Sequence, residues 1–104
     1  MVRPYEALYI VRPDLSDEEI TTITDRYKQV VEEQSGEVES INRWEKRRLA
    51  YEVKGQREGI YVLMNFKSEA KAATELSRLL KIGDDVLRHI IVRLDEDKDV
   101  EPVG

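Results

Sequence analysis

The amino-acid sequence predicts an α+β fold in which a four-stranded antiparallel sheet carries two helices on one of its faces. The hydrophobic patterns follow one another in the order strand, helix, strand, strand, helix, strand. Each helix joins two strands that must run parallel, and right-handed crossovers then place both helices on the same face of the sheet. A chain of 104 residues, of which 40% are hydrophobic, is enough for one domain with its own core.

The first strand is predicted over residues 5–12, which are rich in aromatic and aliphatic side chains and are followed by Pro13. Apolar residues lie at both parities of this segment, which favours a central strand. A helix is predicted from Ser16, because its hydroxyl can accept a hydrogen bond from the amide three residues on while Glu19 reaches back to the cap. Ser35-Gly36 gives this helix a left-handed exit. Its apolar stripe consists of Ile20, Ile23, Tyr27, Val30 and Val31.

A long hairpin is predicted next. Residues 38–44 and 49–54 have strand character, residues 55–59 are expected to form the turn, and residues 60–67 form the returning strand. The basic run Lys46-Arg47-Arg48 lies on this hairpin.

The second helix is predicted from Ser68 to Gly83, and the last strand over residues 87–94, whose apolar residues at both parities leave its buried face unassigned. Residues 95–104 are acidic and are expected to form a mobile tail, which leaves residues 1–94 as a single domain. This order of elements is the ferredoxin-like split βαββαβ arrangement. One face of the sheet then has no helix over it, and exposed basic and aromatic residues can sit there.

Charge is distributed unevenly along the chain. The formal net charge is −5, but residues 43–57 contain six basic and two acidic side chains, a local charge of +4. The acidic residues concentrate in residues 14–33 and in the tail. Attraction to a polyanion depends on the field within a Debye length of about 8–10 Å, so this segment can bind one although the whole chain is acidic.

The residues needed for common catalytic and metal sites are missing from the sequence. It contains no cysteine, and its single histidine, His89, lies inside an apolar strand, where a structural role is expected. Asp84-Asp85 is expected to form a turn rather than a metal site, and no phosphate-cradling glycine motif occurs. The longest apolar run, residues 60–64, is far shorter than the ~20 residues that cross a bilayer. We therefore expect a soluble cytoplasmic protein with no metal or cofactor and no set of residues for nucleophilic catalysis.

The basic hairpin is the main candidate for function. Guanidinium groups interleaved with Trp44 and Tyr51 can pair with phosphates and stack on unpaired bases. The alternative is a solvated charged hairpin that only prevents edge aggregation. The candidate residues on this hairpin for RNA or partner binding are Lys46, Arg47, Arg48, Tyr51, Lys54 and Arg57.

Residues 43–54 (RWEKRRLAYEVK) followed by residues 57–62 (REGIYV) strongly resemble the signature hairpin of the sixth protein of the bacterial small ribosomal subunit. The resemblance extends to residues 4–6 with Arg12-Pro13, and to residues 84–88, so that it covers almost the whole chain up to the tail. It implies the same ferredoxin-like fold and a protein without catalysis. It also implies binding to small-subunit ribosomal RNA as a heterodimer with the eighteenth small-subunit protein, on a junction in the central domain of the RNA.

The resemblance adds two candidate residues to those of the hairpin. Tyr5 matches the aromatic position of the first strand and Arg88 matches a basic position of the last. One residue departs from the family pattern, which usually has glycine after the tryptophan, where this chain has Glu45. A glycine there permits a bulge or a positive φ, whereas Glu in such a conformation costs energy.

Three other functions are compatible with the same order of elements. A module resembling acylphosphatases would use an anion-binding arginine after the first strand, but Arg12 is followed by Pro13-Asp14 instead of a glycine-rich cradle. An RNA-recognition motif would carry two spaced aromatics on its third strand, which residues 58–64 lack. A module that binds only proteins would use the open sheet face or a strand edge.

Overall fold

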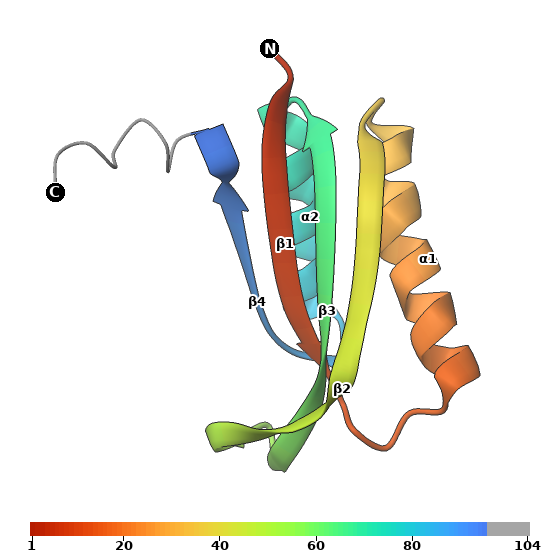
Figure 1. Cartoon of the computed structure of the whole chain (residues 1–104), viewed down its shortest axis with the longest axis vertical. Coiled ribbons are helices and arrows are strands. Elements are labelled where there is room, and N and C mark those ends of the chain that lie inside the picture. The colour runs from red at the N-terminus through yellow and green to blue at the C-terminus, as the bar shows by residue number, and fades with distance from the viewer. Residues whose placement is uncertain (96–104) are drawn as a thin grey trace, which may run out of the picture.

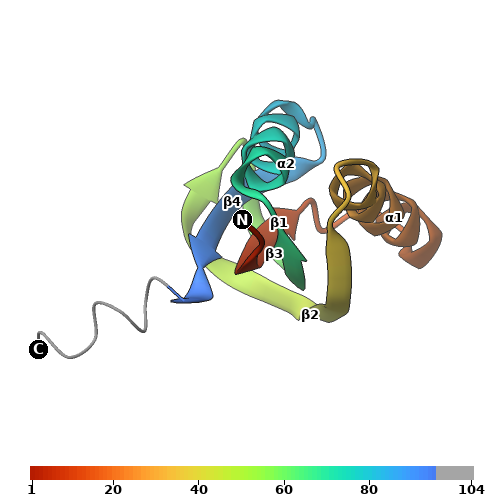
Figure 2. The ribbon, with the colours of Figure 1, turned by 90° about the horizontal axis from the view of Figure 1, so that it is seen from above.

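The computed structural model describes residues 1–95 and has the predicted order of elements (Figure 1). The strands pair antiparallel in the spatial order β2-β3-β1-β4, and both helices lie on the same face of the sheet (Figure 2). This confirms the ferredoxin-like α+β prediction. The elements are β1 (Arg3–Val11), α1 (Asp17–Glu33), β2 (Glu37–Val53), β3 (Gln56–Ser68), α2 (Ala70–Ile82) and β4 (Val86–Arg93).

The core lies between the sheet and the two helices. Alternate residues of β1 face the helices and pair in register with alternate residues of β3, so that Tyr5 stacks on Phe66 with ring centroids 5.4 Å apart. Tyr9 is fully buried and meets Tyr27 of α1 edge to face, at 5.4 Å. The other parity of β1, which includes Leu8, faces the open side of the sheet.

The start and end of α1 agree with the prediction. The Ser16 hydroxyl accepts from the Glu19 amide at 3.1 Å, and the Glu19 carboxylate accepts from the Ser16 amide at 2.8 Å. The chain leaves the helix at Ser35, whose φ is 66°. Gly36 then packs so closely on Val31 that a Cβ at this position would lie 2.6 Å from its Cγ1.

The turn of the hairpin differs from the prediction over residues 55–59. It is the two-residue turn Lys54-Gly55, with φ values of 50° and 80° and Val53 paired with Gln56. Positive φ at both central residues is typical of the tight turns that match the twist of a hairpin. Gly59 is therefore not a turn residue but lies buried in β3, where Ile10 leaves no room for a side chain. The second helix also begins later than the Ser68 start that the sequence predicts, because Ser68 ends β3 and α2 begins at Ala70.

A β-bulge interrupts β2 at Trp44 and Glu45, where the resemblance noted in the sequence leads us to expect a glycine. Arg43 pairs with Val62 and Lys46 with Ile60, so Trp44 and Glu45 together face a single residue of β3. Glu45 is not among the residues with positive φ, so the bulge forms without the conformation that would strain it.

The predicted acidic tail begins at Asp95, the last described residue. Its carboxylate pairs with Arg3 at 2.7 Å and with Arg93 at 3.0 Å. Residues 96–104 of that prediction lie outside the described part of the chain. No helix within residues 1–95 is long and apolar enough to span a membrane.

Candidate nucleic-acid interface

The far end of the β2–β3 hairpin, residues 44–61, forms an arm that runs past the end of the sheet and curves toward the β4 side (Figure 1). It contains most of the site residues predicted from the sequence. Five of these are exposed side chains on β2 and β3: Lys46, Arg47, Arg48, Tyr51 and Arg57.

Strand alternation divides the basic run between the two faces of the arm. Lys46 pairs across the hairpin with Ile60, which faces the helices, and it lines a hollow together with Asp17 of α1. Arg47 pairs with Gly59 and points to the open face of the sheet, and Arg48 again has the parity of Lys46. The three cations are neighbours in the sequence, but they do not form one cluster on one surface.

On the open face the arm carries stacked aromatic and guanidinium groups. Trp44 and Tyr61 stack with centroids 5.8 Å apart and planes 14° apart, and the Arg47 guanidinium carbon lies 5.0 Å from the Trp44 ring centroid. The Arg88 guanidinium lies 5.2 Å from the Tyr51 ring centroid and donates a hydrogen bond to its hydroxyl. A guanidinium held against an aromatic ring keeps its charge while the contact restricts its orientation.

Carboxylates neutralise only part of the basic segment. Arg43 pairs with Asp17 and Arg57 with Glu52, each at 3.6 Å in exposed positions. Within residues 1–95, none of the three consecutive cations of the basic run has a carboxylate within ion-pair distance. The arm therefore presents free positive charge on both of its faces.

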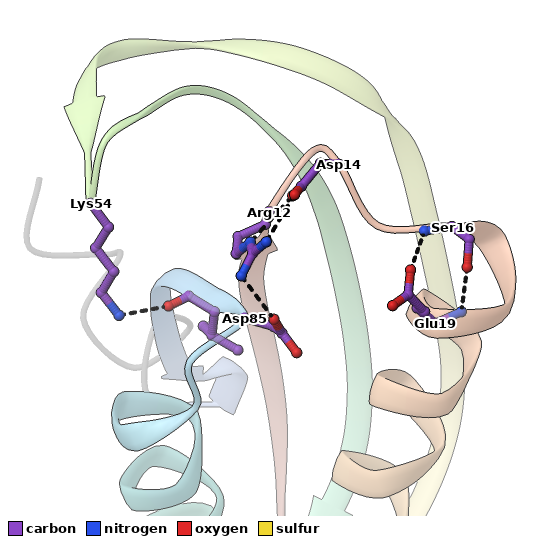
Figure 3. A network of polar contacts seen from close by, with 7 residues as sticks. Arg12, Asp14, Ser16, Glu19, Lys54 and Asp85 are labelled. Atoms are coloured by element: carbon purple, nitrogen blue, oxygen red, sulfur yellow. Dashed lines mark hydrogen bonds and ion pairs between the residues drawn. The ribbon is translucent and has the colours of Figure 1, made fainter.

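Two predicted site residues lie away from this exposed surface. The Tyr5 ring is in the core and only 7% of the residue is exposed, so it has little surface left for RNA or a partner. The Lys54 ammonium reaches past the turn and donates to the Val86 carbonyl of β4 at 2.9 Å (Figure 3).

The prediction overlooked two residues of the open face. Tyr61 completes the stack with Trp44. The sequence indicates its position, because Tyr61 lies on the same side of β3 as the polar residue Asn65, which marks the side away from the core. Ile90 is 56% exposed beside a hollow lined by Leu8 and Ile10. Sequence could not assign its face, because β4 is apolar at both parities.

The features considered for catalysis have structural roles. The Arg12 guanidinium donates to the Asp14 carboxylate at 2.8 and 3.2 Å and lies 3.5 Å from Asp85 (Figure 3). This hydrogen bond lowers the pKa of Asp14. His89 Nε2 lies 2.9 Å from the Ser77 hydroxyl, and burial, with a smaller contribution from a nearby lysine, lowers the pKa of its imidazole. Among residues 1–95, no three His or carboxylate side chains gather into a possible metal site.

Comparison with known proteins adds independent information to this geometry. The family model described as Ribosomal protein S6 matches residues 4–93. The chain belongs to the ribosomal protein S6 family. A small ribosomal subunit protein bS6 from Carboxydothermus hydrogenoformans is 53% identical over 96 residues, covering 92% of this chain and 100% of the relative. The bS6 protein of Desulforamulus reducens is 48% identical over 95 residues, covering 91% and 100%.

Ribosomal protein S6 structures also share the fold. The crystal structure of 30S ribosomal protein S6 from Thermotoga maritima matches with a TM-score of 0.84 and 27% sequence identity, covering 99% of this chain and 98% of that one. Membership of the S6 family makes this chain a structural component of the small ribosomal subunit and not an enzyme.

Proposed function

We propose that the chain binds small-subunit ribosomal RNA together with the eighteenth protein of the small subunit, through the arm and the open face of the sheet. The observation that carries the proposal is the stack of Arg47 and Trp44 of β2 with Tyr61 of β3. The same stretch of β2 carries Lys46 and Arg48, which have no carboxylate partner within the described chain.

The arm has the chemistry that RNA requires. Guanidinium and ammonium groups neutralise phosphates, and exposed aromatic faces offer stacking platforms to unpaired bases. Trp44 is 36% exposed and Tyr51 is 59% exposed, so part of each ring is free for contact. An arm that extends beyond the helices can enter a folded RNA while the acidic body stays outside it.

The open sheet face supports the partner-protein half of the proposal. Ile90 exposes apolar surface beside a hollow. A protein partner typically buries surface of this kind. The charge balance points the same way, because the chain has a net charge of −5 and its basic segment, residues 43–57, carries only +4, which attracts RNA modestly. A second, basic protein on the open face would supply the missing positive charge.

Titration of a labelled junction RNA with the chain alone, with the eighteenth protein alone and with both tests this function. We expect weak binding by the chain alone and at least tenfold tighter binding by the pair. Equal affinity with and without the partner would refute the cooperative part of the proposal.

A charge-matched pair of variants tests the arm. The double variant Arg47→Ala/Arg48→Ala should weaken RNA binding and flatten its salt dependence, by about 0.7–0.9 in log-log slope for each phosphate that the chain no longer neutralises. The control Arg26→Ala/Lys28→Ala removes the same charge from α1 and should leave the slope unchanged. If the arm variant failed to bind the partner instead, with its salt slope intact, those arginines would face protein and not RNA.

A further inference from the structure

The arm touches a strand that the sheet order places far from it. β2 and β4 lie at opposite edges of the sheet, yet Tyr51 near the end of β2 contacts Arg88 of β4. The contact is possible because the end of the hairpin curves back below β1 toward β4 (Figure 1).

The segment that makes this contact is not regularly paired with β3. Between Arg48 and Val53 β2 advances five positions, while β3 moves only two, from Glu58 to Gln56. Residues 49–52 therefore bulge out of the ladder, and an interrupted ladder leaves the direction of the arm weakly defined. Contacts outside the hairpin are needed to fix it.

Two contacts from β4 meet this need. The Arg88 guanidinium carbon lies 5.2 Å from the Tyr51 ring centroid, and the group donates to the Tyr51 hydroxyl, so one side chain makes two contacts with the arm. Lys54, at φ 50° in the turn, donates from Nζ to the Val86 carbonyl at 2.9 Å. Val86 is 2% exposed and belongs to the core, so this carbonyl is a firm anchor.

We propose that Arg88 and Lys54 are positioning residues that latch the arm to β4, and that they act on RNA binding through the arm and not by contacting phosphates. The proposal rests on the proposed RNA-binding function. It assigns RNA contact to Lys46 and Arg48, the cations that have no partner within the described chain. Arg88 and Lys54 carry the same charge but position the arm.

A double-mutant cycle on RNA affinity separates positioning from contact. In the presence of the eighteenth protein, Arg88→Ala and Tyr51→Ala should each weaken binding about three- to tenfold, the effect expected for one cation–π and hydrogen-bond contact. The double variant should bind no more weakly than the worse single variant, because Arg88 acts through Tyr51. Lys54→Met keeps the side-chain stem and should weaken binding without changing the salt slope.

Charge-preserving variants sharpen the comparison. Arg88→Lys keeps the charge but not the planar guanidinium that reaches the Tyr51 hydroxyl and ring together, so it should bind as poorly as Arg88→Ala. Arg48→Lys, the matched change at an expected phosphate contact, should keep most of the affinity, while Arg48→Ala should lower the salt slope by about 0.7–0.9. Additive effects in the cycle, rescue by Arg88→Lys, or a lowered slope in Arg88→Ala would overturn the latch.

Amide hydrogen exchange tests the latch without RNA. Exchange of the arm amides on either side of the bulge, over residues 46–48 and 53–58, should speed up in Arg88→Ala and Lys54→Met, while the core amides of β1 stay protected. Unchanged exchange in the arm would overturn the latch even if RNA binding fell. Faster exchange in an arm that binds no RNA in any background would keep the latch and remove the proposed function.

Discussion

Gly59 is the position at which the arm leaves the sheet, and it is the sharpest test of how the arm is packed. A Cβ added here would overlap Ile10 Cγ2 inside van der Waals contact, lie 3.2 Å from the Val11 carbonyl oxygen and come 3.5 Å from Leu87 Cδ1. Ile10 is β-branched and has little freedom to rotate away, so the strand itself must shift. We therefore expect Gly59→Ala to destabilise the fold although it adds a single methyl group.

The size of the effect follows from that overlap. Overpacking by one methyl group in a well-filled site costs about 1–3 kcal/mol. In a domain of this size each kcal/mol lowers Tm by about 4–8 °C, so Gly59→Ala should melt about 4–24 °C below the wild-type chain. Urea unfolding followed by circular dichroism measures the same destabilisation as a lower midpoint with an unchanged m-value.

A cycle with Ile10→Ala identifies the cause. Removing Cγ2 deletes the principal overlap and leaves the carbonyl contact at 3.2 Å, so Gly59→Ala should cost at least about 1 kcal/mol less in that background. Gly55→Ala is the comparison for backbone strain alone, because its φ is +80° and nothing lies within 4 Å of the added Cβ. A Gly59→Ala chain as stable as the wild type, or additive effects in the cycle, would refute this packing.

Three further outcomes follow from polar contacts. Ser16→Ala removes the α1 cap and should cost about 1 kcal/mol in urea unfolding. Because the Arg12 hydrogen bond lowers the pKa of Asp14, this carboxylate stabilises the fold above the ordinary value of 3.8 and loses that effect as pH falls through its folded pKa. Asp14→Asn should therefore be less stable than the wild type at about pH 7 and equally stable at about pH 2, as urea titrations at the two pH values would show. Burial and then Lys81 lower the pKa of His89, so the unfolded chain takes up a proton first as pH falls below 6.5. Wild-type stability should decline there, and thermal melts of His89→Gln should lack that decline.

The parts of the fold that sequence predicted are those set by local patterns. The start of α1 could be predicted because Ser16 and Glu19 are three residues apart, and the paired strands because apolar residues alternate along them. The turn was misplaced because local rules favour a turn at a glycine such as Gly59 and disfavour the positive φ that Lys54 adopts. The reason for Gly59 is its contact with Ile10, which is 49 residues away in the chain and invisible to a local pattern.

The candidate site was predicted as a set of residues but not as a surface. The basic run on the hairpin was evident from the sequence, and simple alternation would already have separated Arg47 from its two neighbours. The bulge at Trp44 and the contact between Tyr51 and Arg88 depend on tertiary packing across the sheet. The bulge and this contact determine which cations remain free, and the spacing of residues in the sequence does not predict either of them.

The separation between the arm and the acidic body explains how a chain of net charge −5 can approach a polyanion. Within residues 1–95, Asp17 is the one helix carboxylate within ion-pair distance of a basic residue of the hairpin, at Arg43, while Arg57 pairs with Glu52 of the arm itself. Charges beyond about 8–10 Å are screened at ordinary salt, so a phosphate at Arg48 experiences the local cations more than the distant helix. The salt slope of RNA binding should therefore follow the number of free cations on the arm and not the net charge of the chain. Removing acidic residues of α1 other than Asp17, which pairs with Arg43, should leave that slope where it was.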